Sequence, residues 1–321
     1  MRALLIFFAV VKAIDSKLSQ CEDPQTGTRI DDFTIAYRIR RGMNADIFAV
    51  WHHDLRTPLV CKRLRPADEH HAKWRRLLRA EGTALARLSH PGIVRLIRQH
   101  HHAPRPYLLL EHVGQQTLRD ILLDEGALAT DYAVRVVQHT CAALAYAHAR
   151  GFLHRDLKPS NIILREGRPV LLDFGVVWKW KAARRPPDQS GTPQYLAPEQ
   201  IRREPLGPYT DVYGLGILLF ELITGTRPFR VGVDRHDRRM PLAARYPQLI
   251  EAPPSLREAG RRAGQKVSLR LERIVRCCLA PDPAARFQSV EELFVALDPF
   301  TRIKVWPLSV RRTNNNFSPF D

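Results

Sequence analysis

A short polar stretch in the middle of the chain holds the residues best suited to chemistry. It reads Gly-Phe-Leu-His-Arg-Asp-Leu-Lys-Pro-Ser-Asn over residues 151–161, between a predicted helix and a predicted strand. Asp156 is placed to accept a proton from an incoming hydroxyl. Lys158 can neutralise a phosphoryl group in transfer, and the amide oxygen of Asn161 can hold a metal ion. This pattern predicts phosphoryl transfer to a hydroxyl.

A second acidic residue follows an apolar strand. In Leu171-Leu172-Asp173-Phe174-Gly175 the carboxylate comes at the end of the strand, and the glycine lets the chain turn away. We therefore expect Asp173 to bind a magnesium ion that bridges the phosphates of a nucleotide.

A lysine and a glutamate far apart in the sequence form a candidate pair. Glu81 lies on the apolar stripe of a helix predicted over residues 68–88, where an inward-facing carboxylate needs a cation. Lys62 ends the apolar strand Leu59-Val60-Cys61 and is the natural partner. A lysine held in this way can present its ammonium group to phosphate oxygens. The alternative is an ordinary surface ion pair.

Two kinds of structure are predicted to position these residues, after a linker over residues 15–32. The first is a five-stranded sheet with the helix at 68–88, and its strands, separated by turns, are predicted at 33–40, 46–52, 58–64, 93–101 and 106–111. The second is the mostly helical chain after Gly114. Thr130 is expected to cap a long helix that Gly151 ends. Two further short strands and three further helices are predicted at 162–165, 169–172, 209–225, 268–279 and 289–297. Residues 230–267, rich in Arg and Pro, have no predicted structure.

These motifs, taken in order, resemble the protein kinase superfamily, and most closely the bacterial eukaryotic-like Ser/Thr kinases. The resemblance also rests on Ala197-Pro198-Glu199, and Lys158-Pro159 is similar to the Ser/Thr class rather than the Tyr class. It implies an α+β, bilobal protein kinase fold, with a small antiparallel sheet and one main helix in the first lobe and a larger, mainly helical second lobe. The implied divisions are a leader and linker at 1–32, a kinase domain at 33–297 with lobes 33–113 and 114–297, and a tail at 298–321.

The resemblance further implies a site for ATP with Mg²⁺ or Mn²⁺. Leu110 looks like the gatekeeper residue, and Glu111 and Val113 would offer backbone groups to adenine. The apolar walls around the base would come from Ile39, Ile47, Val60 and Ile163. In the family pattern, Asp211 braces the loop over residues 151–161, called the catalytic loop below. In the same pattern, Arg286 pairs with Glu199, and Thr192 bonds to Asp156 and Lys158.

The glycine-rich loop departs from the family pattern. Gly42 matches the middle glycine, whereas Arg40 and Ala45 stand where the first and third usually are. Glycine allows a close backbone approach to phosphates, so each substitution adds bulk and stiffens the loop. This departure favours the alternative of a scaffold protein without turnover. The enzyme is favoured because the five key residues are all present, namely Lys62, Glu81, Asp156, Asn161 and Asp173.

The formal net charge of +17 would attract nucleic acid, acidic lipid or acidic proteins. The charge is spread along the chain, however, and no basic stretch is interleaved with aromatic residues as in single-strand binders. We expect ATP and protein substrates as partners, the chain itself included through autophosphorylation, and no nucleic acid.

The N-terminus begins with an apolar run over residues 3–11 that is too short to span a bilayer and is ended by Lys12. It permits a weak membrane association, and export as a signal peptide is the alternative. The five cysteines contain no C-x-x-C pair, which argues against a disulfide framework and a zinc site. An exported chain would not find ATP easily, so we expect a cytoplasmic protein.

Overall fold

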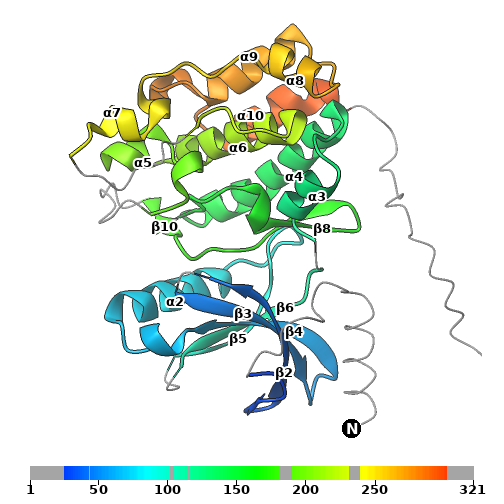
Figure 1. Ribbon diagram of the computed structural model, residues 1–321, viewed down its shortest axis with the longest axis vertical. Helices are drawn as coiled ribbons and strands as arrows, with labels where there is room; N and C mark the ends of the chain where they lie inside the picture. The colour runs from blue at the N-terminus through cyan, green and yellow to red at the C-terminus, as the bar shows by residue number, and fades with distance from the viewer. Residues whose placement is uncertain are drawn as a thin grey trace, which may run out of the picture. The chain divides into compact units, whose positions relative to one another are not determined.

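The computed structural model describes residues 25–42, 44–101, 105–114, 116–180, 190–230 and 239–301. The chain divides into two compact units (Figure 1). Among the described residues, the first unit contains those from 25 to 89 and from 94 to 112, and the second contains those from 90 to 93 and from 113 to 301. The predicted leader over residues 3–11 lies outside the described residues. Within the described part of the chain, no helix is both long and apolar enough to cross a membrane.

The first unit is an antiparallel sheet with one main helix, α2 (Ala72–Leu85). The strands, in the spatial order β1-β2-β3-β4-β6-β5, are β1 (Arg29–Ile30), β2 (Phe33–Arg41), β3 (Ala45–His52), β4 (Thr57–Leu64), β6 (Tyr107–Glu111) and β5 (Leu96–His100). The predicted count of five strands was wrong, because β1 adds a sixth within the predicted linker. Its pairing of Ile30 with Phe33 closes a tight turn at Asp31, whose φ of 48° is left-handed. A strand of two residues is too short to show a periodic pattern.

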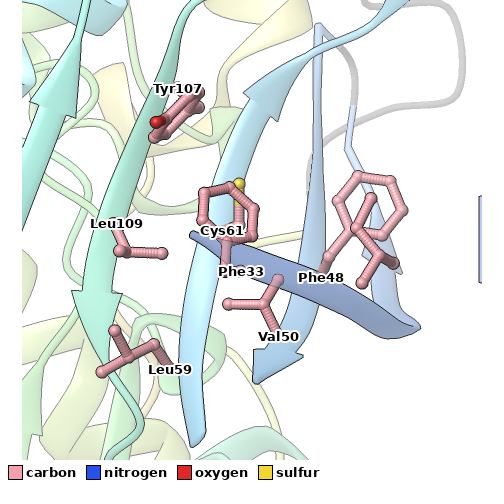
Figure 2. Packing of buried hydrophobic residues seen from close by; sticks show 8 residues of the cluster. Phe33, Phe48, Val50, Leu59, Cys61, Tyr107 and Leu109 are labelled. Carbon is pink, nitrogen blue, oxygen red and sulfur yellow. The ribbon is translucent and has the colours of Figure 1, made fainter. Parts of the chain in front are cut away.

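The two faces of this sheet carry different side chains: Lys62 lies on one face, and a buried apolar cluster lies on the other. Ile47 lies opposite Lys62, and Val60 lies opposite Leu110. Directly opposite residues share a face, as do residues two apart on one strand, so Ile47, Val60 and Lys62 all lie on one face. The other face carries a buried apolar cluster, shown in Figure 2, of Phe33, Ile35, Phe48, Val50, Leu59, Cys61, Tyr107 and Leu109. This cluster anchors the strand that carries Lys62.

Helix α2 begins and ends inside the predicted range of 68–88. A 3-10 turn over Pro66–Asp68 precedes it, and the His71 side chain accepts a hydrogen bond from the Lys73 backbone N–H as its N-cap. Gly82 allows the helix to approach the sheet closely. A Cβ atom at this position would lie 2.3 Å from Oε1 of Gln99 and 2.8 Å from the Leu108 side chain. The close approach places the neighbouring Glu81 against the sheet.

The second unit is mainly helical. Its longer helices are α3 (Leu118–Asp124), α4 (Thr130–Ala149), α6 (Pro208–Thr224), α8 (Leu256–Arg262), α9 (Leu269–Cys278) and α10 (Val290–Leu297). Helix α6 is buried nearly throughout, and α4, α8, α9 and α10 pack against it (Figure 1). It ends at Gly225, whose φ of 70° is the left-handed conformation that glycine adopts readily. The smaller elements are β7 (Phe152–Leu153), β8 (Ile162–Arg165), β9 (Arg168–Leu171), β10 (Trp178–Lys179), α5 (Pro198–Arg202) and α7 (Leu242–Arg245).

Two predictions in this unit need correction. Thr130 is the first residue of α4 and not its cap, because Ala129 occupies the N-cap and the Thr130 hydroxyl donates to the Lys266 carbonyl at 3.2 Å. The predicted strand at 93–101 begins only at Leu96, since Ile93 instead bridges to Leu171 in the second unit. The predicted end of α4 at Gly151, where φ is 83°, is confirmed.

Candidate active site

Asp156 lies in the loop between β7 and the 3-10 turn Pro159–Asn161 and is 8% exposed. One carboxylate oxygen accepts the Thr192 backbone N–H at 2.8 Å. The other accepts Nζ of Lys158 at 2.6 Å and Nδ2 of Asn161 at 3.1 Å. Three donors therefore fix the carboxylate in one orientation, and the structure brings together the three residues for which the sequence predicted catalytic roles.

Thr192 contacts this group in two ways. Its backbone N–H bonds to Asp156, and its hydroxyl accepts a hydrogen bond from Nζ of Lys158 at 2.5 Å. Lys158 therefore bridges the catalytic loop and the segment that carries Thr192. The bonds implied by the family pattern are present, with the side-chain contact made to the lysine alone.

Asp211 on α6 holds the loop through its backbone at His154 and Arg155. Its oxygens accept the backbone N–H groups of His154 at 2.9 Å and Arg155 at 2.8 Å, and Nε2 of His148 lies 2.7 Å away. Burial alone would raise the pKa of Asp211, but the hydrogen bond and charge of His148 and further donors lower it below its usual value. The carboxylate is therefore a stable acceptor. His148 stands four positions after the buried Leu144 on α4, and this helical spacing is the signal that could have identified it as an inward-facing partner.

Asp173 and Asn161 lie in neighbouring stretches of chain. The Leu172 backbone N–H donates to the Asn161 carbonyl at 2.9 Å, and one Asp173 carboxylate oxygen accepts the Gly175 N–H at 2.9 Å. Phe174 stacks edge-on against His154 with ring centroids 4.8 Å apart. These contacts fix the turn that follows Asp173.

The side-chain oxygens of Asn161 and Asp173 are suitable ligands for a magnesium-type ion. The Asn161 amide nitrogen donates to the Asp156 backbone carbonyl at 2.9 Å as well as to its carboxylate, so the amide oxygen is the group available to a cation. No cluster of three or more His, Cys, Asp or Glu residues that could hold a metal ion occurs among the residues that the structure describes. Mg²⁺ commonly takes one or two protein oxygens and completes its shell with phosphates and water.

Lys62 and Glu81 form the ion pair that the sequence predicted. Nζ lies 2.8 Å from one carboxylate oxygen and 2.7 Å from the other, and Glu81 is 2% exposed. The alternative of an ordinary surface pair is therefore wrong for this glutamate. The buried carboxylate needs its cation, because an unpaired charge in such a position would be strongly destabilising.

The predicted nucleotide contacts fall in both units. In the first unit, Ile47 and Val60 share the sheet face of Lys62, and Ile39 lies at a break in the β2–β3 register. The Glu111 carboxylate is engaged with the Arg95 backbone N–H at 2.9 Å, whereas its own backbone N–H donates to the Arg95 carbonyl. In the second unit, Ile163 is on β8, and a Cβ atom on Gly114 would lie 3.3 Å from its side chain.

Gly42 is required by the turn between β2 and β3. Its N–H donates to the Ala45 carbonyl at 3.0 Å, and a Cβ atom on it would lie 2.3 Å from that carbonyl oxygen. Arg40 pairs with Ile47 between β2 and β3, and Ala45 pairs with Leu64 between β3 and β4. The residues that replace the usual glycines therefore extend the sheet, which explains how the loop tolerates them. Met43 lies outside the described residues.

The family model described as the protein kinase domain matches residues 33–295, so the chain belongs to the protein kinase family. The serine/threonine-protein kinase PknB of Mycolicibacterium smegmatis is 34% identical over 226 residues, which cover 67% of this chain and 34% of that protein. A probable serine/threonine-protein kinase of Corynebacterium efficiens, CE0033, is 29% identical over 281 residues, which cover 85% of this chain and 42% of that protein. The chain thus spans less than half the length of these relatives.

A solved structure shows the same fold. The crystal structure of the Mycobacterium tuberculosis PknI kinase domain superposes with a TM-score of 0.65 and 25% identity, covering 86% of this chain and 98% of that one. The predicted fold class and the predicted family of bacterial Ser/Thr kinases are confirmed. Members of this family use ATP and a divalent metal ion.

Proposed function

We propose that the chain transfers the γ-phosphoryl group of ATP to Ser and Thr hydroxyls of proteins, itself included, through a catalytic domain over residues 33–297. The observation that carries the proposal is the fixed Asp156 carboxylate, with Lys158 at 2.6 Å and Thr192 at 2.8 Å. A carboxylate held by three donors and 8% exposed is poised to accept one proton from a hydroxyl that enters the site.

In this proposal, each residue of the catalytic loop has one role. The substrate hydroxyl oxygen forms a bond to the γ-phosphorus, the bond from that phosphorus to the ADP oxygen breaks, and the proton passes to Asp156. Lys158 balances the charge that develops on the phosphoryl oxygens. Asn161 and Asp173 would hold Mg²⁺ or Mn²⁺, which supplies further charge neutralisation when bound. Catalysis is then largely positioning and electrostatics.

The proposed nucleotide contacts begin with the Lys62 ammonium, which Glu81 orients at 2.7 Å for a phosphate oxygen. Glu111 and Val113 would offer backbone groups to adenine. Ile39, Ile47, Val60 and Ile163 would line the base, with Gly42 in the loop over the phosphates. Because ATP is the phosphoryl donor, the proposal places the protein in the cytoplasm.

The direct test is phosphorylation of a generic acceptor such as casein by the purified chain, with labelled ATP and either Mg²⁺ or Mn²⁺. We expect Asp156→Asn to remove nearly all transfer while nucleotide affinity, measured by fluorescence titration, stays close to that of the wild type. Asp124→Asn is the matched control, since Asp124 is exposed at the end of α3. Substantial transfer by Asp156→Asn would contradict the role of the base. ATP binding without transfer by the wild type would favour the scaffold alternative.

A further inference from the structure

The segment from Ser190 to Ala197, here called the platform segment, has an irregular backbone. It contains one 3-10 turn, Pro193–Tyr195, and carries Thr192, which bonds to Asp156. Backbone N–H and C=O groups outside helices and sheets still need partners when they are buried. In this segment, several of those partners are the side chains of two glutamines.

Gln200 on α5 joins the platform segment to the catalytic loop. Its Nε2 donates to the Arg155 carbonyl at 3.1 Å and to the Ser190 carbonyl at 3.4 Å, and its Oε1 accepts the Ala197 N–H at 3.0 Å. The side chain is buried, with 3% of the residue exposed. One amide thus spans both ends of the segment and the residue before the base.

The two stretches of chain that Gln200 joins also lie very close together. Gly191 has a φ of 126°, and a Cβ atom there would lie 3.0 Å from the Arg155 carbonyl oxygen and 2.7 Å from the Leu196 side chain. Any other residue at this position would push the platform segment away from the catalytic loop. The glycine and the glutamine therefore act on the same contact, one by allowing it and the other by bonding across it.

Gln248 holds the same segment from another element. It lies in the 3-10 turn Pro247–Leu249, beside α7, and its Nε2 donates to the Pro193 carbonyl at 3.0 Å and the Leu196 carbonyl at 3.3 Å. Only 1% of Gln248 is exposed, and its Oε1 is buried without a hydrogen-bond partner within the described residues. A buried, half-satisfied amide is a poor choice for stability alone.

We propose that Gln200 and Gln248 are positioning residues that set the platform segment, and with it Thr192, against the catalytic base. This inference rests on the proposed kinase function and concerns the protein acceptor, not ATP. The described partners of the two glutamines are backbone groups of the platform segment and, for Gln200, the Arg155 carbonyl, so the side chains can alter the site of the acceptor hydroxyl without touching nucleotide. Phosphorylation of proteins should therefore depend on both glutamines, whereas hydrolysis of ATP by water should not.

The two glutamines should differ in kinetic effect. Gln200 holds the Ser190 end of the platform segment against the Arg155 carbonyl. Gln200→Met should leave Asp156 held by Lys158 and Asn161 but misalign the acceptor against it, so kcat for the acceptor should fall about tenfold. Gln248 has no bond to the catalytic loop among its described contacts, so Gln248→Met should raise KM for the acceptor about fivefold with little change in kcat. Gln248→Met removes the unpaired oxygen but also leaves the Pro193 and Leu196 carbonyls without this donor, so its midpoint of thermal unfolding should fall, and the kinetics are compared at a temperature well below that midpoint.

The experiment compares the full chain and these two variants in three measurements: steady-state phosphorylation of casein, ATP hydrolysis without acceptor, and thermal unfolding. Gln138→Met is the matched control, because Gln138 is also buried and donates to a backbone carbonyl, that of Phe294 at 3.3 Å, in a different part of the unit. The expected result is a ratio of phosphorylation to hydrolysis that falls for Gln200→Met and Gln248→Met and not for Gln138→Met.

Each other outcome counts against a defined claim. A wild type that binds ATP but neither hydrolyses it nor transfers phosphate overturns the proposed function and this inference with it. An active wild type, with both activities reduced in the same proportion in the glutamine variants, overturns the inference alone, because that result would show only a general loss of folded protein. Unchanged acceptor kinetics in both variants would overturn it as well.

Discussion

Asp211 accepts the backbone N–H of Arg155 at 2.8 Å, across 56 positions of sequence. Arg155 has a φ of 69°, in the left-handed region that residues other than glycine seldom adopt. Such a conformation persists only where surrounding contacts fix it. The aspartate on α6 therefore holds the N–H side of the backbone link that presents Asp156, while Gln200 bonds to the Arg155 carbonyl.

We expect Asp211→Ala to lower the free energy of unfolding by about 3 kcal/mol or more, because it leaves buried backbone N–H groups at His154 and Arg155 without an acceptor. Phosphoryl transfer should fall sharply even at temperatures where the variant remains folded. Urea denaturation and a low-temperature assay would measure the two effects. Asp282→Ala removes an exposed cap of a 3-10 turn and serves as the control, with an expected loss of about 1 kcal/mol. A folded Asp211→Ala variant with wild-type turnover would show that the loop does not need this brace.

Lys62 and Glu81 should behave as one unit in catalysis. Lys62→Met and Glu81→Ala each break the same pair, whose atoms lie 2.7 and 2.8 Å apart, so the second change has little left to remove. In a double-mutant cycle on kcat/KM for ATP, we expect a coupling energy of about 1–3 kcal/mol. Glu69→Ala gives the comparison, since Glu69 is paired with Arg105 at 3.3 Å, and its effect should add to that of Lys62→Met. If the fold-losses in kcat/KM from Lys62→Met and Glu81→Ala simply multiply in the double variant, the two residues are not coupled.

Arg286 and Glu199 form a second buried pair, with both guanidinium–carboxylate distances at 2.9 Å and side-chain exposures of 0% and 1%. Removing one partner leaves an uncompensated buried charge, so Arg286→Ala should lower the free energy of unfolding by about 3–5 kcal/mol. Arg286→Lys should not restore it, since an ammonium cannot make the two parallel contacts. Denaturant titration of these variants beside the exposed-site variant Arg273→Ala would measure the difference. A loss for Arg286→Ala no greater than that for Arg273→Ala would mean that the pair is dispensable.

The parts of this site that could be predicted from sequence are charged residues and residues in helices or strands with a periodic apolar pattern. Glu81 was identified because an acid on an apolar helical stripe must find a cation, and the strand before Lys62 was identified by its apolar run. The two-residue strand at Arg29–Ile30 has no period to detect. The 3-10 turn over Pro247–Leu249 falls in an Arg- and Pro-rich stretch that has no apolar periodicity from which its structure could be predicted.

Contacts to backbone atoms were the least predictable. Gln248 carries no charge and stands in no recognisable spacing. Within the described part of the chain it bonds only to the carbonyl groups of Pro193 and Leu196, a group that every residue possesses. Nothing in the identity of those two residues indicates the partner. Thr130 shows the converse error, because its type favours a cap while the chain places Ala129 at that position. Such choices depend on how the segments meet in three dimensions.

Stability should depend on pH through His154. This residue is fully buried, its ring stacks on Phe174, and its Nδ1 accepts the Asp156 backbone N–H at 3.3 Å, so the folded state requires the neutral ring. Burial lowers the pKa of His154 below its ordinary value of 6.5, although the nearby carboxylates of Asp211, Asp156 and Asp173 act in the opposite direction. The pKa values of His90, His112 and His139 are also lowered, with burial as the first cause in each.

The sign of the effect follows from which state binds the proton. As the pH falls below 6.5, the unfolded chain protonates this histidine while the folded chain does not, so the stability that is complete above that pH is lost on acidification. The slope from one such group reaches at most about 1.4 kcal/mol per pH unit. Urea denaturation between about pH 5 and about pH 8 should therefore show a falling free energy of unfolding on the acid side, with a smaller slope in His154→Phe. His70→Phe, at a side chain that is 87% exposed, should keep the wild-type slope. If His154→Phe also keeps it, protonation of His154 in the unfolded state is not the source of the acid sensitivity.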